Sequence, residues 1–64
     1  MLVYMSLIDS AEDQSKFEKI YLKYRNLMFY IANRILNSSQ DSEDTVHNAF
    51  IKIAENIHKI DDVD

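Results

Sequence analysis

The sequence of 64 residues contains no glycine, proline, cysteine or tryptophan. The turns of β-hairpins normally need glycine or proline, so the absence of both residue types favours a helical fold. The absence of cysteine excludes disulfides, thiolate chemistry and zinc sites with cysteine ligands. A chain of this length forms one domain at most and buries only a small hydrophobic core. We therefore expect residues 1–64 to form a single all-α domain.

The N-terminus lacks a basic leader followed by a long apolar run. The apolar cluster of residues 1–5 is too short to be a signal peptide or a membrane span. The default expectation is therefore a soluble cytoplasmic protein that has no contact with a membrane.

The charge of the chain is unevenly distributed. Residues 1–36 carry five basic and four acidic side chains, whereas residues 37–64 carry two basic and seven acidic ones, for a net charge of −4. An acidic second half suits a basic protein surface better than a nucleic-acid backbone. An acidic face that serves only solubility is the alternative interpretation.

Two helices are expected before residue 37. The first is short and covers residues 2–8. The second begins either at the capping-box pattern of residues 15–18 or earlier, at Asp9 or Ser10. Asn37 is expected to end it, because asparagine can adopt the left-handed conformation that closes a helix when glycine is absent.

A third helix follows a short polar turn. Ser39 or Asp41 is expected to cap it, and it should run to about Lys59, before the acids Asp61, Asp62 and Asp64. A short turn between two long helices makes an antiparallel hairpin. With the first helix packed across the open side of this hairpin, the expected fold is a small three-helix bundle.

Apolar residues recur at helical spacing on both long helices, and they predict the core. On the second helix these residues are Phe17, Tyr21, Tyr24, Met28, Ile31 and Ile35. On the third helix they are Val46, Ala49, Phe50, Ile53, Ile57 and Ile60. The second helix carries further apolar residues beside this stripe, so it is expected to be covered on two sides.

The opposite face of the third helix is mostly polar. At about 100° per residue, this face holds Asp44, Asn48, Ile51 and Glu55, with His47 beside them. An isoleucine among polar side chains predicts either the apolar centre of a small docking patch or an ordinary exposed side chain.

Residues 43–53 (EDTVHNAFIKI) carry a recognisable order of acidic and apolar positions. This order resembles region two of bacterial RNA polymerase sigma factors of the small, extracytoplasmic-function-like group. Residues 17–36 resemble the helix that precedes it in that family. The resemblance covers residues 17–60 and implies a module of transcription initiation.

In that family, this helix docks on the helical clamp of the polymerase β′ subunit. The resemblance implies that Asp44, His47, Asn48 and Ile51 would bind this partner, and Glu55 shares their face. The family often has glutamine at the position of His47 and glutamate at that of Asn48. An anti-sigma factor is a further candidate partner.

The family continues into a basic, aromatic-rich helix that melts and reads the promoter, and then into region four. This sequence stops at Asp64, before both of these segments. The resemblance therefore implies a partial region two, which contacts promoter DNA only through segments absent here.

Enzymatic and metal-binding functions find little support in the sequence. No nucleophile and base follow a catalytic order, and no glycine-rich phosphate loop exists. His58 and Asp62 would supply only two metal ligands, so no metal or other cofactor is expected. The alternative function comes from another class: a helical adaptor unrelated to transcription that forms a homodimer through the wide apolar surface of its second helix.

Overall fold

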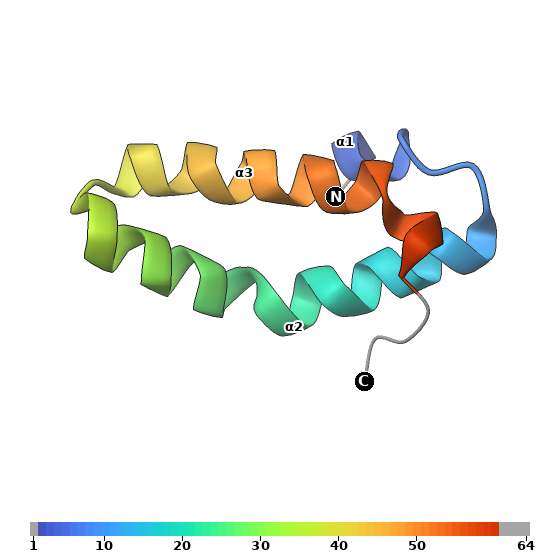
Figure 1. The fold of residues 1–64 in the computed structure, drawn as a ribbon, viewed down its shortest axis with the longest axis horizontal. Coiled ribbons are helices and arrows are strands. Elements are labelled where there is room, and N and C mark those ends of the chain that lie inside the picture. Colours follow the sequence, from blue (N-terminus) through green and yellow to red (C-terminus); the bar gives the residue numbers. More distant parts are fainter. Residues whose placement is uncertain (1, 61–64) are drawn as a thin grey trace.

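The computed structural model describes residues 2–60, which form α1 (Leu2–Met5), α2 (Ala11–Leu36), α3 (Ser39–Glu55) and the 3₁₀-helix η1 (Ile57–Lys59). Figure 1 shows α2 and α3 side by side in opposite directions, with α1 beside the C-terminal half of α3. No strand occurs between residues 2 and 60, so the predicted all-α fold of a short helix plus a long antiparallel hairpin is confirmed. None of the helices described is long and apolar enough to cross a membrane.

The first helix is shorter than predicted and ends at Met5 rather than at residue 8. The side-chain amide of Gln14 donates to the carbonyl oxygens of Met5 (3.3 Å) and Ile8 (3.0 Å), so a residue of α2 occupies these acceptors. α2 starts at the earlier of its two predicted positions. The hydroxyl of Ser10 accepts a hydrogen bond from the backbone N–H of Asp13 at 3.3 Å, which caps this end.

The turn between α2 and α3 is tighter than predicted. Asn37 adopts the left-handed conformation (φ 52°, ψ 39°) and donates its backbone N–H to Asn33, as expected for the end of α2. The cap of α3 is Ser38, whose hydroxyl accepts from the backbone N–H of Asp41 at 3.2 Å. The predicted caps Ser39 and Asp41 were wrong, because the left-handed Asn37 reverses the chain in a single residue.

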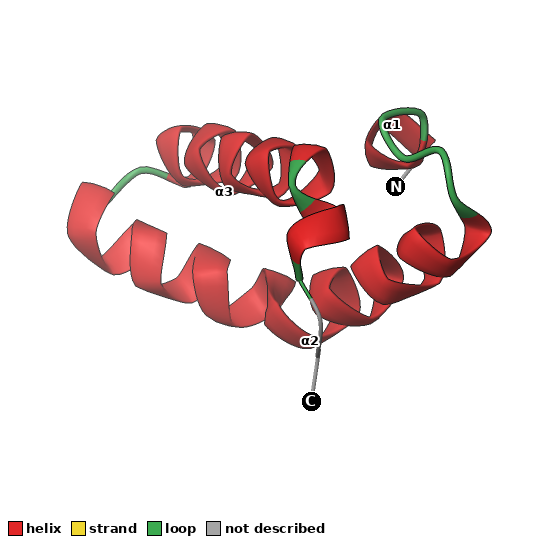
Figure 2. Cartoon of the chain, turned by 45° about the vertical axis from the view of Figure 1, so that its right-hand side comes forward, coloured by secondary structure: helices red, strands yellow, loops and turns green. Residues whose placement is uncertain are grey.

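The last predicted helix divides into two parts. α3 ends at Glu55, and η1 continues to Lys59 and packs against α2 (Figure 2). The side-chain amide of Asn56 donates to the carbonyl of Lys52 at 2.9 Å, where the α-helix ends. The Lys16 ammonium group of α2 donates to the carbonyl oxygens of Ile57 and Ile60, which ties η1 to α2. The acids Asp61, Asp62 and Asp64 lie outside the described residues.

The core lies at the open end of the hairpin, where all four elements meet. Phe17 of α2 and Phe50 of α3 are 0% and 1% exposed, and their ring centroids lie 6.0 Å apart. Tyr4 of α1 packs 5.3 Å from the Phe17 ring, and Tyr21 packs 4.9 Å from the Phe50 ring. Four aromatic rings therefore form the centre of the core, and the remaining buried members of this cluster are Ile8, Ile20, Ala54 and Ile57.

Part of the predicted core of α2 was wrong. Phe17 is buried, and Tyr21 and Met28 are half-buried, but Tyr24, Ile31 and Ile35 are 36%, 49% and 77% exposed. α1 and η1 pack at the open end of the hairpin only, so among the described residues no third layer covers α2 near the turn. On α3 and η1, the predicted Phe50 and Ile57 are buried, and Val46, Ala49, Ile53 and Ile60 are half-buried.

The position of the core can be tested with one buried and one exposed substitution. Phe50→Ala should lower the free energy of unfolding by about 3–5 kcal/mol, because it empties the centre of the aromatic cluster. Ile35→Ala should change it by less than about 0.5 kcal/mol, because this side chain is exposed. Urea denaturation followed by circular dichroism measures both changes, and equal losses would contradict a core at the open end.

The buried Tyr4 also predicts a pH dependence of stability. Burial raises the pKa of the Tyr4 hydroxyl above its usual value of 10.0, and neighbouring Tyr21 raises that pKa further. The neutral phenol is therefore favoured in the folded state. Its contribution to stability is fully present below pH 10 and is lost as the pH rises through the raised pKa.

Urea denaturation at increasing pH above 10 tests this dependence. The free energy of unfolding of Tyr4→Phe should decline less with pH than that of the unmodified protein, because phenylalanine cannot ionise. Tyr30→Phe is the matched control, since Tyr30 is 58% exposed and should keep the original decline. Identical pH profiles for the unmodified protein and Tyr4→Phe would contradict the prediction.

Candidate functional site

The outward face of α3 carries the polar residues that the sequence singled out. Asp44, His47, Asn48 and Glu55 are all exposed, whereas Phe50 and Ala54 of the same helix are buried. The helix thus has one face in the core and one polar face in solvent, as its periodicity predicts.

Ile51 differs from the prediction. It is half-buried and packs against the core cluster, so the freely exposed isoleucine predicted for this face was wrong. α1 packs on α3, and its Met5 is half-buried against the same core cluster. The polar side chains of this face remain exposed, whereas Ile51 keeps only part of its surface accessible.

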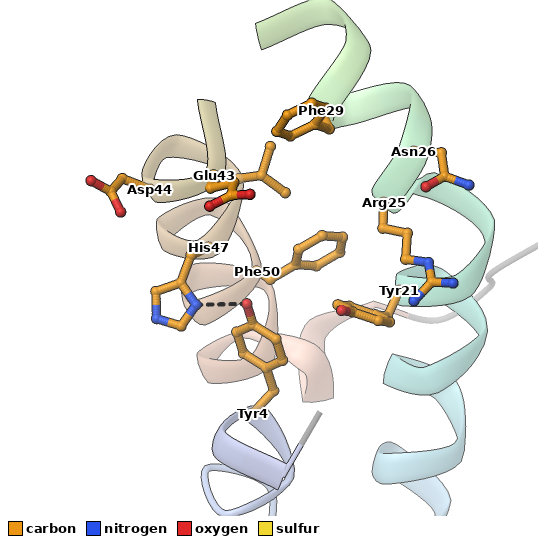
Figure 3. A pocket seen from close by; sticks show the side chains of 10 residues that line it. Tyr4, Tyr21, Arg25, Asn26, Phe29, Glu43, Asp44, His47 and Phe50 are labelled. Carbon is orange, nitrogen blue, oxygen red and sulfur yellow. Dashed lines mark hydrogen bonds between the residues drawn. The ribbon is translucent and has the colours of Figure 1, made fainter. Parts of the chain in front are cut away.

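His47 is held by the N-terminal helix. The hydroxyl of Tyr4 lies 2.7 Å from Nδ1 of His47, and the ring centroids are 5.3 Å apart (Figure 3). Sequence reasoning missed Tyr4 in both the core and this face. The two residues are 43 positions apart, and periodicity within one helix gives no information on contacts between distant helices.

A groove lies beside His47, between α2 and α3. Tyr4, Tyr21 and Phe50 contribute aromatic rings to it, with Arg25 on the α2 side (Figure 3). The Arg25 guanidinium carbon lies 5.5 Å from the centroid of the Tyr21 ring, within the range of a cation–π contact. The other residues that line the groove are Asn26, Phe29, Glu43, Asp44, Val46 and His47.

The first turns of α3 present two carboxylates in different directions. In Figure 3, Asp44 points away from α2, whereas the Glu43 carboxylate lies closer to the groove. Helical periodicity predicted the outward position of Asp44. The outward carboxylate is the one that a separate molecule can reach most directly.

The chemistry of this face is hydrogen bonding and ion pairing. Among the described residues, no group of three or more histidine and carboxylate side chains could hold a metal ion. Every buried side-chain nitrogen or oxygen in that part of the chain has a hydrogen-bond partner. Ser42, the buried polar residue, donates its hydroxyl to the Ser38 carbonyl at 2.6 Å. The candidate metal ligand Asp62 lies outside residues 2–60.

A comparison with protein families finds a match over most of the chain. The family model described as Sigma-70 region 2 matches residues 20–64, which include most of α2, all of α3 and η1. α1 and the start of α2 lie outside the match. No curated protein and no solved structure matches the chain.

The match covers more than half of the chain and includes the whole polar face of α3. Members of this family are not enzymes. They act in transcription initiation as parts of sigma factors, and they bind the RNA polymerase core. On the strength of this match and of its all-helical fold, the chain belongs to the Sigma-70 region 2 family.

Proposed function

We propose that α3 docks this module on the clamp helices of the polymerase β′ subunit. The docking face consists of Asp44, His47, Asn48, Ile51 and Glu55. The main support for the proposal is that α3 is amphipathic. It buries Phe50 and Ala54, and it leaves the polar residues of the docking face exposed. All of these residues lie in the segment that matches the family model.

Charge supports a basic partner. The salt bridge found among residues 2–60 joins Lys16 and Asp13, so neither Asp44 nor Glu55 has an ion-pair partner in that part of the chain. Unpaired carboxylates on one exposed face attract a basic surface and fix the register of docking. The accessible part of Ile51 adds a small apolar contact between them.

The docking mechanism is non-enzymatic. α2 supports α3 through the shared aromatic core, and α3 carries the contacts to β′.

We assign residues 1–64 to one helical domain, a partial region two of the extracytoplasmic-function-like group. In a full-length factor it would support promoter recognition and melting through segments absent from this sequence. This function would place the protein in the cytoplasm, and an anti-sigma factor could compete for the same face.

Substitution of Asp44 tests the docking face. Asp44→Asn should weaken binding to purified RNA polymerase core about five- to tenfold, because it removes a charge that faces a basic partner. Glu18→Gln is the matched control: it removes the same charge from an exposed position of α2 and should bind normally. Fluorescence titration gives both affinities, and circular dichroism checks that helicity is unchanged. If Asp44→Asn and His47→Ala both bind like the unmodified chain, the docking assignment is wrong.

The exposed surface of α2 favours a second function, self-association through a copy of the same chain. Large hydrophobic side chains are exposed along this helix: Leu22, Tyr24, Leu27, Tyr30, Ile31, Ile35 and Leu36. Next to them, an apolar groove near the turn is lined by Met28, Ile31, Ala32, Ile35, Thr45, Val46 and Ala49. Contiguous apolar surface of this kind marks an interaction site on a small protein. Two copies of α2 related by a twofold axis would cover it symmetrically.

Sedimentation equilibrium tests self-association. The unmodified protein should form a dimer, and Ile31→Glu should shift it to a monomer, because the new charge would be buried without a partner. Ile31→Leu, which keeps the apolar surface, should still form the dimer. A monomer at all concentrations would contradict this second function and leave polymerase docking unaffected.

A further inference from the structure

The hydrogen bond between Tyr4 and His47 joins the core to the docking face. Tyr4 is 7% exposed, and its ring packs against Phe17, Tyr21 and Phe50 at centroid distances of 5.3, 5.7 and 5.9 Å. These contacts hold the hydroxyl in one position. The same hydroxyl lies 2.7 Å from Nδ1 of His47, which is itself exposed. A rigid, buried group therefore contacts an exposed member of the docking face.

The direction of this hydrogen bond follows from the chemistry of its two groups. A phenol is a good donor, and an unprotonated imidazole nitrogen is a better acceptor than a phenol oxygen. The pKa of the Tyr4 hydroxyl lies above its usual value of 10.0, so at neutral pH this hydroxyl carries a proton that it can donate. In a neutral histidine, the bond made by one ring nitrogen determines which nitrogen carries the hydrogen. With Nδ1 as the acceptor, the hydrogen of His47 lies on Nε2.

We propose that Tyr4 is a positioning residue for docking: it sets the tautomer and orientation of His47, so that Nε2–H is offered to the partner as a hydrogen-bond donor. The partner surface should then place an acceptor, a carboxylate or carbonyl oxygen, opposite His47. This inference rests on the proposed function, because it assigns a role to one residue of the docking face.

The geometry of the face agrees with this role. In Figure 3, the second ring nitrogen of His47 points away from Tyr4 and from α2, toward the side where Asp44 projects. Asp44 and His47 are three residues apart on α3, so they are neighbours on one helix surface. The face therefore presents an acceptor at Asp44 next to a donor at His47. A matching partner would place a basic group and an acceptor side by side.

Tyr4 lies outside residues 20–64, the segment that matches the family model, whereas His47 lies inside it. The contact therefore connects the matched segment to an N-terminal helix that lies outside the match. Tyr4 of α1 would therefore affect the affinity of docking without contacting the partner itself.

Tyr4→Phe isolates the hydroxyl. The phenylalanine ring preserves the aromatic packing, and water can replace the hydroxyl at the exposed His47. The affinity for purified RNA polymerase core should fall about fivefold, the loss expected for one misdirected hydrogen bond. Nitrogen-15 NMR of the histidine ring provides a second readout. It should show Nε2–H alone in the unmodified protein and a mixture of both tautomers in Tyr4→Phe.

A double-mutant cycle separates positioning from a structural effect. In a His47→Ala background, Tyr4→Phe should cause no further loss of affinity, because no imidazole remains to be oriented. A loss in this background equal to that in the unmodified protein would show that Tyr4 acts only through packing. Ser15→Ala removes an exposed hydroxyl from α2 and should leave both the affinity and the His47 tautomer unchanged.

Different results would contradict the docking face and the positioning role of Tyr4. If Asp44→Asn and His47→Ala both leave polymerase binding intact, the docking face itself is wrong. If His47→Ala weakens binding but Tyr4→Phe changes neither affinity nor tautomer, docking stands and the positioning role of Tyr4 is wrong.

Discussion

The aromatic cluster at the open end of the hairpin is the interaction on which the rest of this structure depends. A chain of 64 residues buries little apolar surface, so a few large rings have to supply most of its packing energy. Phe17 and Phe50 join the two arms of the hairpin, and Tyr4 attaches α1 to them. Near the turn, α2 and α3 pack on each other without further cover from residues 2–60, because α1 and η1 pack at the other end. Stability is therefore concentrated at one end of the molecule.

The docking face of α3 is oriented by this cluster. Phe50 lies between His47 and Ile51 in the sequence, so the same helix turns carry the core contact and the polar face. Since α3 is rigid along these turns, the position of Phe50 in the core sets the direction of the polar side chains.

The sequence predicted the hairpin from its short polar turn, the role of Asn37 from the conformations open to asparagine, and the polar face of α3 from helical periodicity, because each depends on residues close in sequence. Periodicity did not predict the position of every side chain. It did not predict the cover on Ile51 or the exposure of Ile31 and Ile35. Periodicity shows which side of a helix is apolar, but not whether another element covers that side. Tyr4 was missed for the same reason, since its partners Phe50 and His47 lie far along the chain. Whether the docking face binds β′ depends on a second molecule, whose shape the sequence does not contain.

The small side chains near the turn have one more consequence. Ser42 is completely buried and Ala32 is 9% exposed, so at this end small side chains fill the space between α2 and α3. In a chain without glycine, serine and alanine are among the smallest side chains that can occupy these buried positions. A larger side chain at either position would push the first turns of α3 away from α2. Glu43 and Asp44 lie on those turns, so a change in the spacing between α2 and α3 would change the direction in which these two carboxylates point.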